Sequence, residues 1–60
     1  MQNLTQSEAN SIREVASAHI TMHSKLCAYA NQCQDQQVKQ MLSQAATESQ
    51  KSAQNLIQML

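Results

Sequence analysis

The chain contains no glycine and no proline in 60 residues, and this absence limits its fold more than any other feature. Glycine and proline mark turns more strongly than other residues, so a turn-rich β fold is not expected. Walker A loops and dinucleotide-binding loops need glycines at fixed positions, and both are excluded. At this length the chain is at most one small domain, in a size range where a hydrophobic core is marginal.

The first periodic segment begins at a signal for a helix N-terminus. Thr5 to Glu8 matches a capping box, in which the Thr5 hydroxyl accepts from the Glu8 amide and the Glu8 carboxylate reaches back. After this signal the residues of an apolar stripe recur at steps of three and four, namely Ile12, Val15, His19, Met22, Leu26, Tyr29 and Cys33. A second line widens the stripe, namely Ala9, Ala16, His23 and Ala30. The spacing predicts a helix over about residues 6–31.

A polar turn at about residues 32–35 separates this pattern from a second one, and Asp35 can cap the helix that follows. The second pattern predicts a helix over about residues 36–59, with apolar positions at Val38, Met41, Leu42, Ala45, Ala46, Ala53, Leu56, Ile57, Met59 and Leu60. Because the turn is short, the helices are expected to be antiparallel neighbours. We therefore predict an all-α fold, a single helical hairpin domain over residues 1–60.

Both apolar stripes are wider than the seam that two helices can cover. Leu42, Ile57, Met41 and Met22 would stay partly exposed in a lone antiparallel two-helix hairpin. Two hairpins packed face to face would cover them. We therefore expect a homodimeric four-helix bundle, in which folding and association are one process.

Charge and hydropathy limit the classes of partner. Four basic and four acidic residues give a formal net charge of zero, and no basic stripe is present to bind phosphates. Nucleic acid is therefore not an expected partner. No run of the chain approaches the roughly 18 apolar residues of a membrane span. Residues 1–6 lack the pattern of a secretory signal, so synthesis in the cytoplasm is expected.

His19 and His23 are four residues apart on one helix face, a spacing that suits two metal ligands. Antiparallel pairing around the turn would bring Glu48 opposite His19 as a third ligand. The interpretation that we favour is structural, with both histidines as tolerated polar residues of the bundle. They would then bond to Glu48, Ser49 or Ser52 across the seam, and the chain would hold no metal and no cofactor.

Cys27 and Cys33 are six residues apart, which matches neither a CxxC motif nor a disulfide framework. An internal disulfide would need the first helix to end early, whereas Cys33 near the turn could pair between molecules. The favoured interpretation is two free thiols. Neither thiol shows a general base at a readable spacing, so a cysteine nucleophile is not expected. The chain is predicted not to be an enzyme.

The segment from Leu26 to Leu42, followed by Glu48 and Asn55-Leu56, resembles the small spore coat proteins of endospore-forming bacteria. These are short relatives of spore coat protein F, and the resemblance covers about residues 12–60. In that family a helix ends in a Tyr-Ala run and a turn with Asp, often Asp-Pro, leads into the second helix. Here Gln36 stands where the proline often stands. The resemblance implies a ferritin-like helical core.

The resemblance does not extend to ferritin-like oxidase chemistry. Ferritin-like helices usually carry a His three residues after a Glu, but here Lys51 follows Glu48 at that distance. What the resemblance implies is a structural, self-associating component of the endospore coat. Such a protein is made in the mother cell and layered on the spore, where other coat proteins are further partners.

Two other functions stay open. One is a degenerate ferritin-like metal-binding four-helix protein that uses His19, His23 and Glu48. The other is a small regulatory hairpin that binds a partner helix in a groove.

Overall fold

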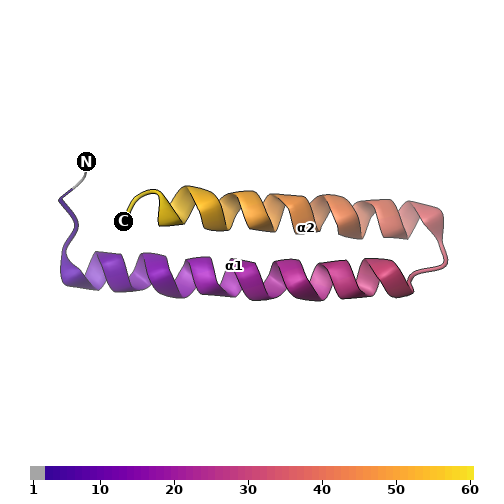
Figure 1. Ribbon diagram of the computed structural model, residues 1–60, viewed down its shortest axis with the longest axis horizontal. Coiled ribbons are helices and arrows are strands. Elements are labelled where there is room, and N and C mark those ends of the chain that lie inside the picture. The colour runs from indigo at the N-terminus through magenta and orange to yellow at the C-terminus, as the bar shows by residue number, and fades with distance from the viewer. Residues whose placement is uncertain (1–2) are drawn as a thin grey trace.

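The computed structural model describes residues 3–60, which form two helices, α1 (Gln6–Gln32) and α2 (Gln36–Ile57). The helices lie side by side and antiparallel, joined by residues 33–35, so that the start of α1 and the end of α2 lie at the same end of the hairpin (Figure 1). The Cα atoms extend over 46 × 16 × 9 Å, which is one layer of two helices. The predicted all-helical hairpin is confirmed, although α2 ends at Ile57 rather than near residue 59.

Both helices begin at the capping residues that the sequence predicts. The Thr5 hydroxyl accepts from the Glu8 amide at 3.0 Å, and the Glu8 carboxylate accepts from the Thr5 amide at 2.9 Å. The Asp35 carboxylate accepts from the amides of Gln37 and Val38 at 2.9 and 3.1 Å. These amides have no partner inside the helix, so the caps determine where each helix starts.

The capping box predicts how stability responds to acid. The Thr5 backbone amide holds the pKa of the Glu8 carboxyl below its ordinary value of 4.5, and the Thr5 hydroxyl lowers it further. Because the folded pKa is the lower one, the stabilising contribution is present above pH 4.5 and is lost as the pH falls through the folded pKa. Glu8→Gln removes this titration. We expect the free energy of unfolding, measured with urea, to fall more for the wild type than for Glu8→Gln between neutral and acid pH. Identical pH profiles would contradict this role of Glu8.

The two helices meet along a seam of small residues. Among the described residues, all four that are buried are alanines, Ala16 and Ala30 on α1 and Ala46 and Ala53 on α2. Their spacing within each helix is a multiple of seven, which keeps one line of residues against a partner helix. No large side chain is fully buried within residues 3–60. The fully buried part of the core is therefore made of alanine methyl groups, and Ile12, Leu26, Leu42 and Leu56 are half-buried beside it.

The position of the seam corrects one prediction. Of the predicted stripe, Val15 and Tyr29 are 47 and 54% exposed, and Met22 is 49% exposed, as expected for a lone hairpin. The fully buried residues lie on the neighbouring line, where Ala16 and Ala30 are 3 and 4% exposed, while Ile12, His19 and Leu26 of the stripe are half-buried. The physical reason is that two helices in contact cover one narrow strip. Small residues in that strip let the backbones approach, and this displaces the larger side chains to its side.

Candidate functional site

Several of the exposed larger side chains lie on one side of the seam, whereas Ile20 and Ile57, 50 and 48% exposed, lie on the other side. Val15 and Tyr29 each precede a buried alanine of α1, and Met22 is spaced seven residues from both. On α2, Val38 and Met41 likewise come one residue before the half-buried seam positions Lys39 and Leu42. Because the helices are antiparallel, residues that come just before the seam positions of either helix lie on the same side of the hairpin. We call Val15, Met22, Tyr29, Val38 and Met41 the apolar face.

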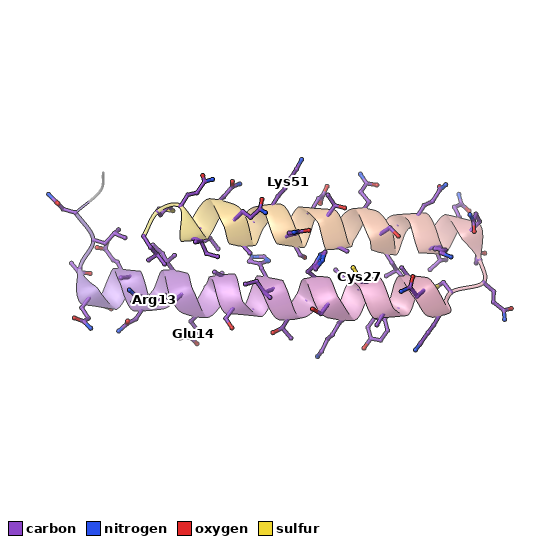
Figure 2. All side chains as sticks on the ribbon, viewed as in Figure 1. Arg13, Glu14, Cys27 and Lys51 are labelled. Atoms are coloured by element: carbon purple, nitrogen blue, oxygen red, sulfur yellow. The ribbon has the colours of Figure 1, made fainter. Side chains whose placement is uncertain are left out.

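The apolar face is exposed along its length. Val38 and Met41 of α2 are 42 and 67% exposed, comparable with the α1 residues of the same face. Its five members carry no charge, and the charged residues that follow on this side are Lys25 of α1 and Glu48 of α2, both exposed. Figure 2 shows that other charged side chains, such as Glu14 and Lys51, point away from the partner helix. The described residues contain no helix long and apolar enough to cross a membrane.

A hydrogen-bonded pair of side chains lies at the seam, with His23 on the alanine line and Cys27 on the side of that line opposite the apolar face. His23 and Cys27 are one helical turn apart on α1 and both are half-buried. The His23 Nε2 atom lies 3.7 Å from the Cys27 sulfur, and the His23 Nδ1 atom lies 2.7 Å from the backbone oxygen of Ala46. Figure 2 shows Cys27 beside the seam, in the space between α1 and α2.

The carbonyl of Ala46 determines the tautomer of His23. A carbonyl oxygen only accepts hydrogen bonds, so Nδ1 must carry the proton that joins α1 to α2. In the neutral ring the Nε2 atom is then an acceptor, and the Cys27 thiol donates to it. This arrangement is a thiol, a base and a group that orients the base, which is the general pattern of an activated nucleophile.

This pair corrects the prediction that neither thiol has a general base nearby. Its signal was present in the sequence, because a separation of four residues puts His23 and Cys27 on one helix face. The sequence could not indicate that the Ala46 carbonyl bonds to His23, because every residue has a backbone carbonyl.

The metal-site residues are placed differently from the predicted site. Among residues 3–60, no three His, Cys, Asp or Glu side chains gather closely enough to hold a metal ion. His23 bonds to the backbone of Ala46, not to Glu48, Ser49 or another side chain of α2. His19 is half-buried in the seam, whereas Glu48 is exposed.

The second thiol has no such surroundings. Cys33 follows the end of α1 and is half-buried, and its backbone amide donates to the carbonyl of Ala30 at 3.2 Å. Both cysteines are free thiols. The Cys27 sulfur makes the one thiol hydrogen bond found in the described part of the chain.

Comparison with known proteins identifies no relative of this chain. No family model, no curated protein and no solved structure matches the chain significantly. The apolar face and the His23–Cys27 pair are the two features of the described residues on which a functional proposal can rest.

Proposed function

We propose that this chain is a structural module that acts by self-association, pairing two hairpins through the apolar face into a four-helix bundle. The observation that carries the proposal is the contrast in size between the buried residues and the exposed residues of the apolar face. The buried residues of the described hairpin are four alanines, while the larger side chains of the apolar face are 42 to 67% exposed. Alanine burial contributes little, because hydrophobic stabilisation scales with the apolar area removed from water.

A second copy of the chain suits this face better than a charged partner. The net charge is zero, so two copies do not repel each other over long range. A two-fold axis parallel to the helices would place α1 of one hairpin over α2 of the other. The edge of the face that carries Lys25 would then meet the edge that carries Glu48. The same residues of the face would then be buried in both copies, as in any isologous interface.

The setting that we propose for this module is the endospore coat. The support is the resemblance of residues 12–60 to small spore coat proteins. A coat layer needs proteins that bind copies of themselves and other coat proteins, and the apolar face would supply the first of these contacts.

Measurement of mass and stability as a function of protein concentration tests the self-association. We expect twice the chain mass by sedimentation velocity at micromolar concentration, and a Tm that rises with concentration because the folded state is dimeric. For coupled folding and association, a tenfold rise in concentration adds about 1.4 kcal/mol to the stability per dimer. A helical monomer with a Tm independent of concentration would contradict the proposal.

Fractionation of spores tests the setting separately. We expect mass spectrometry to find peptides of this chain in the insoluble coat fraction of purified spores. Recovery of the chain from the mother-cell lysate alone would reject the coat as its setting, and it would leave the dimer untouched.

A further inference from the structure

His23 and Cys27 form a unit that self-association does not use. Cys27 comes three residues before Ala30, whereas Tyr29 of the apolar face comes one residue before it. At 100° of rotation per residue, these offsets put Cys27 and Tyr29 on opposite sides of the alanine line. A second hairpin on the apolar face would therefore leave Cys27 uncovered.

We infer that Cys27 is a nucleophilic thiol for thiol–disulfide exchange, with His23 as its base and a low-molecular-weight disulfide as its substrate. The thiol already donates to Nε2 of His23, so the atom that must take the proton is in hydrogen-bond contact with it. The ring is held in this tautomer by the bond from Nδ1 to Ala46 on the other helix. The base is thus positioned only when α1 and α2 are paired.

The exchange balances without any further reagent. The Cys27 sulfur attacks one sulfur of the disulfide while its proton passes to Nε2 of His23. The bond between the two substrate sulfurs breaks, and its electron pair leaves with the departing sulfur. That thiolate takes the proton back from His23 and leaves as a thiol. The Cys27 sulfur is oxidised to a mixed disulfide, and the departing sulfur is reduced.

Two features of the site favour a small substrate. Cys27 is half-buried beside the seam and is not on a protruding loop, so a compact disulfide reaches it more readily than a folded protein does. The residues on this side of α2, Ser43 and Gln50, are polar and exposed, which suits a hydrophilic peptide-like molecule. Glutathione disulfide has these properties and is the probe for the test.

The second cysteine provides an internal comparison. Cys33 is also half-buried, but its sulfur has no hydrogen bond to a base. Cys33→Ser isolates Cys27, and Cys27→Ser isolates Cys33. With glutathione disulfide at neutral pH, mixed-disulfide formation followed by intact mass should be about a hundredfold faster at Cys27 than at Cys33, the low end of general-base effects. Equal rates, or a faster Cys33, would overturn the inference.

Substitution of the histidines separates a base effect from a packing effect. In the Cys33→Ser background, His23→Gln should slow the reaction of Cys27 about a hundredfold, because glutamine cannot take the thiol proton. His19→Gln alters the same seam one turn earlier and should leave the rate within about twofold. Equal slowing by both variants would mean that packing, not proton transfer, controls the thiol.

If circular dichroism shows that His23→Gln loses helicity, a second measurement replaces it. This measurement compares the reaction rate of Cys27 in the folded chain with its rate in the chain unfolded by urea. The Cys33→Ser chain should then react faster when folded than when unfolded, because the pairing of α1 with α2 orients the base. A thiol of ordinary reactivity would instead react more slowly when folded, since it is half-buried there. That result would overturn the inference.

Discussion

Replacement of Met22 by glutamate is expected to separate the proposed dimer into monomers, whereas the same replacement of Ile20 is expected to leave it intact. The two residues are matched, because they lie two positions apart on α1 and are 49 and 50% exposed in the hairpin. They differ in position, since Met22 belongs to the apolar face and Ile20 lies on the other side of the seam. Glutamate is a good helix former at either site, so α1 is preserved.

The expected size of this effect follows from the burial of charge. A carboxylate at position 22 would be buried without a partner in each copy, at a cost of about 3–5 kcal/mol. The dimer holds two such carboxylates, so a cost of about 3 kcal/mol for each weakens the dimer Kd on the order of 10⁴-fold. Sedimentation equilibrium over a range of concentrations measures both variants against the wild type. Equal weakening by Met22→Glu and Ile20→Glu would show that the apolar face is not the interface.

Enlargement of a seam alanine is expected to destabilise the hairpin itself. Ala53 is 2% exposed between α1 and α2, so Ala53→Leu forces three extra carbon atoms into a closed contact. Overpacking of this kind costs about 1–3 kcal/mol. For a domain of this size, that cost lowers Tm by roughly 10 °C.

Ala28→Leu is the matched control for this change, because Ala28 is exposed on the outer face of α1. It makes the same substitution on a helix surface, and we expect a change in stability of about 0.5 kcal/mol or less. Thermal unfolding at one fixed protein concentration compares the two variants. An Ala53→Leu protein as stable as Ala28→Leu would mean that the helices do not meet closely along the alanine line.

The alternative metal-binding function has no support in the described geometry. His19, His23 and Glu48 do not form a cluster of three ligands, and Nδ1 of His23 already bonds to the Ala46 carbonyl. His19 and His23 are four residues apart on α1, and both are half-buried. The prediction of their partners depended on side-chain directions across the seam, which a sequence pattern does not specify.

The sequence by itself determined the local structure. The Thr5–Glu8 capping box and the Asp35 cap act within three residues, so the beginnings of both helices and the short turn were predictable. The hairpin followed from that turn. The His23–Cys27 pair was equally local, because one turn of α1 brings the two side chains together.

Only the tertiary structure decided which strip of each helix faces the other. The alanine line and the line of Val15, Met22 and Tyr29 are neighbours on α1, and periodicity alone cannot separate them. The alanines occupy the seam because small side chains let the backbones approach. The same contact brings the Ala46 carbonyl to His23, so the ring orientation depends on a backbone atom 23 positions along the chain. Such a bond is fixed by the pairing of the two helices, and no residue type signals it in advance.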